Sequence, residues 1–376
     1  MEIRYFDNSA TTRVKEEVLQ EMFPYLSVQY GNPSSIYSVG RNAKRAIEEA
    51  RKRVASLINC KPEEIYFTSC GSESDNTALK GIAYANQKKG KHIITSKIEH
   101  PAILHSCQNL ENHGFEVTYL DVDKNGFVNL EILKNAIRPD TILISIMSAN
   151  NEIGTIEPIE EIAKIAHKNN IIFHTDAVQA VGNIPIDVQK MEIDMLSLSG
   201  HKIYAPKGVG ALYIKKGIEF ERFIDGGHQE KNKRAGTENV AQIVALGKAA
   251  QIAEKNLTQY QNKLKELRDF CLKEMKENIP NFRINGTMEK RLPGNLNVSF
   301  EGVDSSELLF KLDEFGICAS GGSACSSGDN NPSHVLTAIG VPSELAKGAI
   351  RFTFGDFNTK EEVEYLVKIL KEVLTN

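Results

Sequence analysis

Short runs of β-branched residues alternate with longer helix-like segments along the first two thirds of this chain, and few architectures accommodate that order. The runs have the length and composition of buried strands. They are residues 65–68, 92–95, 117–120, 141–147, 171–175, 195–199 and 210–214. Because helix-like segments separate them, as in the crossover units of a parallel sheet, we predict an α/β fold.

One of the helix-like segments shows its pattern clearly. In residues 41–59, Ala43, Ile47, Ala50 and Val54 recur at helical spacing, and charged residues occupy the other face. This spacing predicts a surface helix that packs its apolar face against the core.

The pattern changes after Gly236. Residues 238–277 are typical of one long helix, and two strand-like patches follow at 295–300 and 349–354. We predict a second, smaller α+β domain whose junction with the first lies in the long helix, near residue 250. The predicted division assigns residues 15–250 to a large α/β domain, and residues 1–14 and 251–376 to the small domain.

Composition and charge exclude several classes of protein. Hydrophobic residues make up 41% of the 376 residues, which supplies a large core and argues against a disordered chain. Lys plus Arg total 45 against 49 for Asp plus Glu, so nothing indicates direct binding to nucleic acid. The most apolar run, 141–147, is far shorter than the roughly 18 residues of a membrane span, so we expect no membrane insertion.

Cysteine usage bears on location and on metals. The six cysteines form no CxxC pair, and the N-terminus lacks a basic and apolar signal region, so we expect a cytoplasmic protein with reduced thiols. Cys318 and Cys325 are not accompanied by further Cys or His residues at ligand spacing, so we predict no metal site. Cys318 is expected to be a buried strand residue of the small domain.

Two residues with chemical potential follow neighbouring predicted strands. Lys202 comes just after the strand 195–199, at the edge where open α/β sheets bind ligands, and a lysine there can form a Schiff base with an aldehyde cofactor. Asp176 follows the strand 171–175 and could pair with a protonated pyridine nitrogen. Each has a plainer interpretation: Lys202 as a surface lysine in a loop, and Asp176 as the N-cap of a helix.

A third strand end carries glycine and hydroxyl residues. After the strand 65–68, Gly71 and Ser72 lead into a helix that we expect to begin near Ser74 or Asp75, and free amides at a helix start bind phosphate. An ordinary capping loop is the alternative. No GxxxxGK[ST] motif is present, and no GxGxxG motif follows a strand, so nucleotide-binding fingerprints are missing.

His100 and Asn151 follow two further predicted strands. An imidazole at that edge can stack on a planar cofactor and move protons, although most histidines do neither. Each of these signals is weak alone, but five of them converge on one sheet edge.

The motifs together resemble a known family. In order and spacing they are similar to the cysteine desulfurases of the NifS/IscS type, which are class V aminotransferases and pyridoxal-phosphate enzymes of fold type I. The resemblance runs from Phe6 to Asp356 and implies a mostly parallel seven-stranded sheet flanked by helices, a smaller C-terminal α+β domain and a homodimer. The motifs are FDNSATT, FTSCGSESDN, EHPAIL, ANNEIG, HTDAVQ, SLSGHK, RAGTEN and SGGSACSSG.

The resemblance also implies roles for individual residues. Lys202 would be the Schiff-base lysine, Asp176 the partner of the pyridine nitrogen, and His100 the ring-stacking residue. Gln179 would contact the phenolic oxygen, and Asn151 would lie at the cofactor. The phosphate would be held by Gly71, Ser72, Ser199 and His201, with Thr237 reaching it from a neighbouring subunit. The substrate carboxylate would be bound by Asn151 and Arg351, with help from Asn32.

Cys325 would carry the sulfur. It lies in a glycine- and serine-rich segment, which we expect to be mobile enough to reach both the cofactor and an outside acceptor. The implied reaction converts L-cysteine to L-alanine and leaves a persulfide on Cys325. A sulfur-acceptor protein for iron–sulfur cluster assembly or tRNA thiolation would then receive the sulfur.

Three alternatives stay open at this point. A selenocysteine lyase or an aminotransferase of the same fold would keep the cofactor and change the reaction. A scaffold without catalytic activity would bind partners only. The group that deprotonates the thiols, His100 or the substrate's own amine, is also open.

Overall fold

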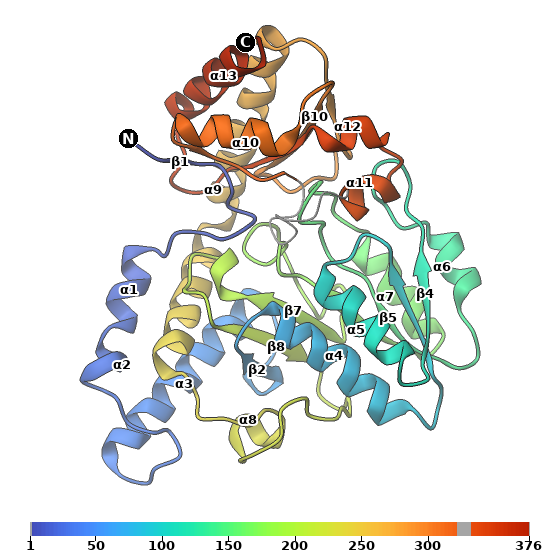
Figure 1. Ribbon diagram of the computed structural model, residues 1–376. Helices are drawn as coiled ribbons and strands as arrows, with labels where there is room; N and C mark the ends of the chain where they lie inside the picture. The colour runs from blue at the N-terminus through green and yellow to red at the C-terminus, as the bar shows by residue number, and fades with distance from the viewer. Residues whose placement is uncertain (1, 322–331, 376) are drawn as a thin grey trace.

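The computed structural model describes residues 2–321 and 332–375, and a seven-stranded sheet forms its centre (Figure 1). Its strands are β2 (Ile65–Thr68), β3 (His92–Ser96), β4 (Glu116–Leu120), β5 (Thr141–Ser145), β6 (Ile172–Asp176), β7 (Met195–Ser199) and β8 (Gly210–Ile214). Their order across the sheet is β2-β8-β7-β6-β5-β3-β4. Strand β8 is antiparallel to both neighbours, and the other neighbouring pairs are parallel, so the predicted α/β fold is confirmed.

The predicted strands of this sheet are all present, and the largest difference lies at residues 141–147. There β5 ends at Ser145, because the amide of Met147 donates to the Glu99 side chain (3.0 Å) instead of continuing the pairing with β3. A side-chain acceptor supplied by a neighbouring loop cannot be read from the apolar run itself.

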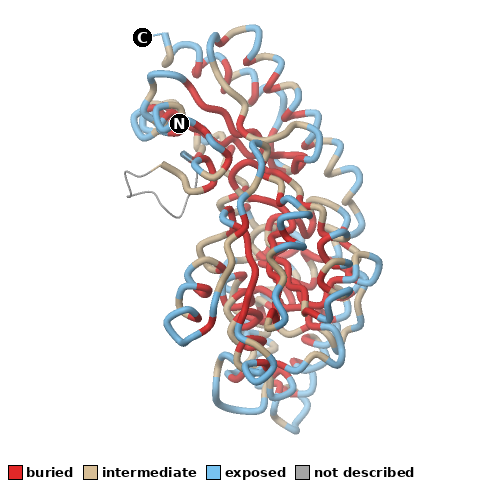
Figure 2. Tube along the Cα trace, turned by 90° about the vertical axis from the view of Figure 1, so that its right-hand side faces the viewer, coloured by how far each residue is buried: buried red, intermediate tan, exposed pale blue. Residues whose placement is uncertain are grey.

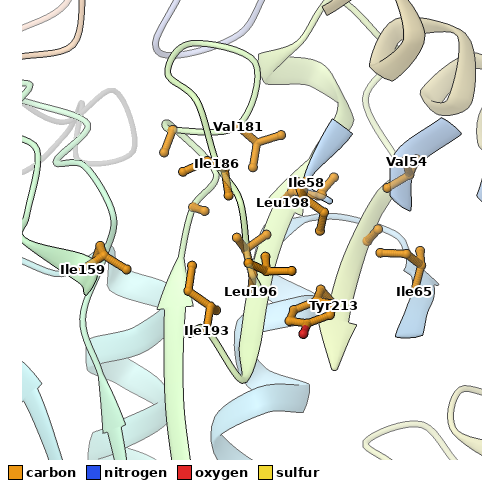
Figure 3. Packing of buried hydrophobic residues seen from close by; sticks show 14 of the residues in the cluster. Val54, Ile58, Ile65, Ile159, Val181, Ile186, Ile193, Leu196, Leu198 and Tyr213 are labelled. Atoms are coloured by element: carbon orange, nitrogen blue, oxygen red, sulfur yellow. The ribbon is translucent and has the colours of Figure 1, made fainter. Parts of the chain in front are cut away.

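Helices cover both faces of this sheet. Successive residues of β8 alternate between two apolar clusters, with Ala211 and Tyr213 in one and Leu212 and Ile214 in the other. The first cluster, part of which Figure 3 shows, includes residues of α3 (Ser38–Leu57), α7 (Ile159–Lys168) and the first half of α9 (Val240–Asn278). The second includes residues of α4 (Gly71–Asn86) and α5 (Pro101–Glu111).

The predicted surface helix is α3, which begins three residues before the expected position and ends two residues before it. Its end has a clear local cause. Asn59 adopts the left-handed conformation (φ 55°), and the amide of Cys60 turns back to the carbonyl of Ala55 (3.0 Å). Asparagine tolerates this conformation better than most residues do.

A smaller antiparallel sheet lies beyond the large one, at the top of Figure 1. It contains β9 (Phe282–Ile284), β10 (Asn295–Phe300) and β12 (Ala349–Thr353), in the order β12-β10-β9. Beside it, β1 (Arg4–Tyr5) pairs in parallel with β11 (Ile317–Cys318). Cys318 is therefore a strand residue as predicted, although it is half-buried. A separate apolar cluster joins this sheet to α10 (Ser305–Glu314), α13 (Lys360–Thr375) and the second half of α9.

Helix α9 connects the two parts of the molecule, as Figure 1 shows. The long helix predicted at 238–277 is thus confirmed, and its first turn is capped by Asn239, which accepts a hydrogen bond from the amide of Gln242 (3.4 Å). Figure 2 shows buried residues along the middle of both parts, with exposed residues on the outer turns.

The remaining elements are short. They are the helices α1 (Glu16–Met22), α2 (Pro24–Ser27), α6 (Leu130–Ala136), α8 (Gln229–Asn232), α11 (His334–Ala338) and α12 (Ser343–Lys347), and the 3₁₀ turns η1 (Pro62–Glu64) and η2 (Gly200–Lys202). Among residues 2–321 and 332–375, no helix combines the length and the apolar character that crossing a bilayer requires.

Candidate active site

A cavity of about 220 Å³ opens at the carboxyl edge of the parallel strands. It collects residues from the ends of β2, β3, β5, β6 and β7, together with the N-terminal segment and β12. Ten of the residues that sequence reasoning selected line it: Gly71, Ser72, His100, Asn151, Asp176, Gln179, Ser199, His201, Lys202 and Arg351.

Lys202 lies at the end of η2, directly after β7. Its ammonium group donates to the carbonyl oxygens of Ser9 and Ala10, the latter at 2.8 Å. The same N-terminal segment accepts a hydrogen bond at Ser9 from the Gln179 side chain (3.0 Å). The lysine is therefore half-buried and directed into the cavity by backbone carbonyls, which excludes the interpretation as a surface lysine.

Asp176 ends β6 and is almost fully buried. One carboxylate oxygen accepts a hydrogen bond from the amide of Val178 (2.9 Å). The residues that follow form a turn, not a helix, so the N-cap interpretation is wrong. Burial raises the pKa of Asp176, while the hydrogen bond from the amide of Val178 and the positive charge of Lys202 act to lower it.

His100 precedes α5, which Pro101 begins. Its Nδ1 accepts a hydrogen bond from the amide of Ala102 (3.1 Å), so a neutral ring carries its hydrogen on Nε2. Burial lowers the pKa of His100, which favours that neutral ring. A planar, neutral imidazole above the cavity is suited to stacking on a flat cofactor.

Asp75, His100 and Asp176 present ligand atoms within 4.8 Å of one another. Such a cluster attracts a positively charged group, which a protonated pyridine nitrogen supplies as well as a metal ion does. The absence of a metal here stays a prediction.

The start of α4 forms one wall of the cavity. The helix begins at Gly71, three residues before the expected Ser74, because Cys70 is already the extended N-cap residue (φ −173°) and the chain turns helical at once. A Cβ on Gly71 would lie 2.7 Å from Val178 Cγ2, so only glycine fits here without a shift. The first amides of this helix are thereby available to an anion in the cavity.

Ser199 and His201 face the same wall. The Ser199 hydroxyl is buried, with 4% of the residue exposed, and it has no hydrogen-bond partner among the residues that the structure describes. His201 Nδ1 is 3.1 Å from the Thr11 hydroxyl, and burial lowers its pKa to about 4, so the ring is neutral. An orphaned hydroxyl beside a helix start is the arrangement that a phosphate group would complete, so these residues fit pyridoxal phosphate.

Arg351 reaches the cavity from β12 of the smaller sheet. Only 1% of it is exposed; its guanidinium donates to Asp7 (2.7 Å) and to the carbonyl oxygen of Asn151 (2.9 Å). Its Nε is buried and has no partner within residues 2–321 and 332–375. The arginine is thus held in place while its Nε–H is left without a partner in the described residues.

Two selected residues, Asn32 and Thr237, do not line the cavity, and a third lies outside the part of the chain that the structure describes. Asn32 lies in an exposed loop, where its side chain accepts a hydrogen bond from the amide of Ser34 (2.9 Å). Thr237 is exposed and lies on a separate hollow. Cys325 falls outside the described residues.

Sequence reasoning missed four residues that build the site: Asp7, Ser9, Ala10 and Asp75. The first three belong to the motif FDNSATT and the last to FTSCGSESDN, so the motifs themselves contained them. No local spacing indicates that the N-terminal segment crosses the cavity to meet Lys202, because that contact joins residues 193 positions apart.

A mostly parallel sheet whose carboxyl edge brings together a lysine, a buried aspartate, a neutral histidine and an anion-binding helix start defines a pyridoxal-phosphate enzyme of fold type I. Comparison with known proteins gives the family. The sequence profile described as "Aminotransferase class-V" matches residues 4–366. The chain is 53% identical over 372 residues to "Cysteine desulfurase IscS" of Clostridium botulinum strain Hall, covering 98% of this chain and 94% of the relative.

Solved structures agree. The structure of a "NifS-like protein" superposes with a TM-score of 0.94 at 41% identity, over 100% of both chains. Another, "SspA in complex with cysteine", gives a TM-score of 0.84 at 39% identity, covering 95% of this chain and 100% of the other. The chain therefore belongs to the NifS/IscS-type cysteine desulfurases of the class V aminotransferase family. It is an enzyme, and its cofactor is pyridoxal phosphate.

Proposed function

We propose that this enzyme takes sulfur from L-cysteine, releases L-alanine, and passes the sulfur through Cys325 to a sulfur-acceptor protein of iron–sulfur cluster assembly or tRNA thiolation. The observation that carries the proposal is the single cavity in which Lys202 faces Asp176 and His100 while Arg351 enters from the smaller sheet. The related protein whose structure was determined with cysteine supports the choice of substrate.

The residues that line the cavity have separate proposed roles in binding the cofactor and in the reaction. Bound pyridoxal phosphate supplies an electron sink for the substrate's Cα. We propose that Lys202 binds the cofactor covalently and moves the Cα proton. Asp176 pairs with the ring nitrogen, and His100 stacks on the face of the ring. Gln179 and Asn151 contact the ring substituents, and the phosphate is assigned to Gly71, Ser72, Ser199 and His201.

Arg351 and Asn151 are proposed to bind the substrate carboxylate. The Nε of Arg351 is buried without a partner among the described residues and so offers a donor for that carboxylate. Asp7 already binds another nitrogen of the guanidinium (2.7 Å). We also propose that Asn32 helps to bind the substrate carboxylate. Because Asn32 does not line the cavity of its own chain, it would have to act at the cavity of a second subunit.

The sulfur step needs one nucleophile. The Cys325 thiolate attacks the sulfur of the bound cysteine, an S–S bond forms, and the C–S bond breaks. The electron pair of the C–S bond returns to the substrate's Cβ, which takes up a proton. The product is then released as alanine. The acceptor then removes the outer sulfur of the persulfide. Proton removal from the thiols is assigned either to His100 or to the substrate's amine.

A homodimer is part of the proposal. Large apolar side chains are exposed along residues 23–37, among them Tyr30 (75% exposed) and Ile36 (88% exposed). A hollow of about 570 Å³ joins Pro33 of this segment to Glu238, the neighbour of Thr237. A second copy that covers the hollow would bury residues 23–37 and the neighbourhood of Glu238. It would also place Thr237 of this copy near the phosphate site of the second copy.

We also propose that the chain divides near residue 250 into the two domains predicted from the sequence, 15–250 and 1–14 with 251–376. Apolar residues of α9 up to Ile252 pack with the large sheet, and those from Leu264 onward pack with the small one. The cytoplasm stays the proposed location, on the reduced-thiol composition alone.

The test is to incubate the purified protein with cysteine and pyridoxal phosphate, to assay alanine and sulfide, and to map added sulfur by mass spectrometry. Without an added thiol we expect alanine together with one extra sulfur on Cys325; with a reducing thiol, which supplies the two electrons, we expect alanine and sulfide in equal amounts. C325A should abolish sulfide production and keep the cofactor's absorption, whereas the matched control C318A should retain turnover. Transfer of the amino group to a keto acid, with the same turnover in C325A as in the wild type, would favour an aminotransferase. A preference for selenocysteine would favour the lyase. A colourless protein would favour a scaffold without catalytic activity.

A further inference from the structure

Asp75 is a buried acid that the proposed chemistry does not use. It lies in the second turn of α4, only 1% of it is exposed, and it lines the cavity behind Asp176. Its Oδ1 has no hydrogen-bond partner among the residues that the structure describes. A buried, charged carboxylate oxygen without a hydrogen-bond donor destabilises the folded state, so the charge state of Asp75 requires an explanation.

The groups around Asp75 do not favour a negative charge. Asp176 presents a ligand atom within 4.8 Å, and a negative charge on Glu99 or Cys70 would also disfavour a charged Asp75. Burial raises the pKa of Asp75 well above its ordinary value, and the charge of Asp176 raises it further. A hydrogen bond from Ser197 acts in the opposite direction and is the smaller effect.

The nearest base is His174, whose Nε2 is 3.9 Å from Asp75 Oδ1. Both of its ring nitrogens are engaged, by Ser145 (2.9 Å) and by Ser197 (3.0 Å). Burial lowers the pKa of His174 to about 3, so the imidazole is neutral and supplies no positive charge to Asp75.

Two carboxyl groups this close in a buried site cannot both be ionised. The proton must therefore reside on one of them. Asp176 faces the ammonium group of Lys202, whose positive charge favours its ionised form, and it accepts a backbone hydrogen bond from Val178. Asp75 faces a neutral imidazole and further acids, so the proton resides on Asp75.

We propose that Asp75 is a positioning residue: a neutral carboxylic acid behind Asp176 that keeps one negative charge, on Asp176, directed at the ring nitrogen of the cofactor. The inference rests on the proposed role of Asp176. The competing arrangement is an ionised Asp75 that joins Asp176 and His100 around a cation.

Infrared spectroscopy tests the charge state directly. At neutral pH the holoenzyme should show the carbonyl stretch of a protonated carboxyl group, and D75N should lack it. D176N removes the neighbouring charge, so the pH at which the band disappears should fall. Absence of the D75N-sensitive band, or a D176N midpoint equal to that of the wild type, would overturn the proposal.

Function gives a second readout. D75A, which leaves a void beside Asp176, should lower kcat about tenfold or more, whereas D75N, a neutral group of the same shape, should recover most of the loss. KM for cysteine should change little, and the pH at which the cofactor's visible absorption changes should move in D75A only. D75N as damaging as D75A would contradict a neutral acid. A protein that binds no cofactor would refute the proposed function, whereas the same infrared comparison of wild type and D75N as apoproteins would still decide the charge state of Asp75.

Discussion

Among single residues, burial decides which side chains of this enzyme carry charge. His100 and His201 are neutral because burial lowers the pKa of each ring, and Glu99 and Glu157 have pKa values raised to about 8 for the same reason. The charged groups that remain at the cavity are Asp176, Lys202 and the ion pair of Arg351 with Asp7. Backbone carbonyl oxygens accept hydrogen bonds from the Lys202 ammonium group.

Glu157 allows this to be tested away from the cavity. It is buried, one oxygen accepts from the amide of Val128 (3.1 Å), and the other has no partner in the described part of the chain. Its folded pKa of about 8 exceeds the ordinary 4.5, so the native state keeps a proton that the unfolded chain releases between those pH values. The wild type should therefore lose about 1.4 kcal/mol of stability for each pH unit across this window.

E157Q cannot lose that proton, so its stability relative to the wild type should rise from pH 5 to pH 8. Urea unfolding at several pH values measures the difference. E344Q, at an exposed residue, serves as the control and should follow the wild type. A constant difference between E157Q and the wild type would mean that Glu157 is already ionised at low pH.

The sequence could identify Lys202, Asp176 and His100 because each follows a strand end, where position in an α/β fold indicates function. It could not identify Asp7 or Asp75. Asp7 acts through Arg351, which is 344 positions away, and the importance of Asp75 depends on its closeness to Asp176 in space.

At the level of secondary structure, the start of α4 is the element whose exact position matters most. The expected start at Ser74 placed the first turn outside the cavity, whereas the observed start at Gly71 directs its first amides inward. Strand composition located β2 exactly, but the helix start depends on how closely Gly71 approaches Val178, which sequence spacing does not reveal.

G71A should therefore weaken cofactor binding by about tenfold or more, since its Cβ would lie 2.7 Å from Val178 Cγ2 and push the first turn away. Titration of the cofactor into the apoprotein measures this affinity. The double variant G71A/V178A relieves the clash and should recover most of the affinity. Tight binding by G71A alone would show that the first turn does not hold the phosphate.

On the scale of the whole molecule, the cavity needs both sheets. The large sheet supplies Lys202 and Asp176, the small sheet supplies Arg351, and helix α9 packs against both apolar clusters. Hydrophobic periodicity predicted both parts and the long helix between them. It could not predict how the parts face each other, because that arrangement depends on long-range contacts such as the one between Arg351 and Asn151.

A dimer built through residues 23–37 should fall apart when charges enter that surface. Y30D/I36D should be monomeric by analytical ultracentrifugation and should bind the cofactor about 10- to 100-fold more weakly, because Thr237 of the second copy no longer reaches the phosphate. F310D changes a residue that is 68% exposed on α10 and should stay dimeric. A dimeric Y30D/I36D would place the interface elsewhere.

The central claim is that the cofactor is held covalently at Lys202, between Asp176 and the start of α4. Borohydride reduction of the holoenzyme followed by peptide mass spectrometry tests it most directly. The pyridoxyl group should be found on Lys202 in the wild type and be absent from K202A. A label on a different lysine, or active enzyme without any label, would contradict the account.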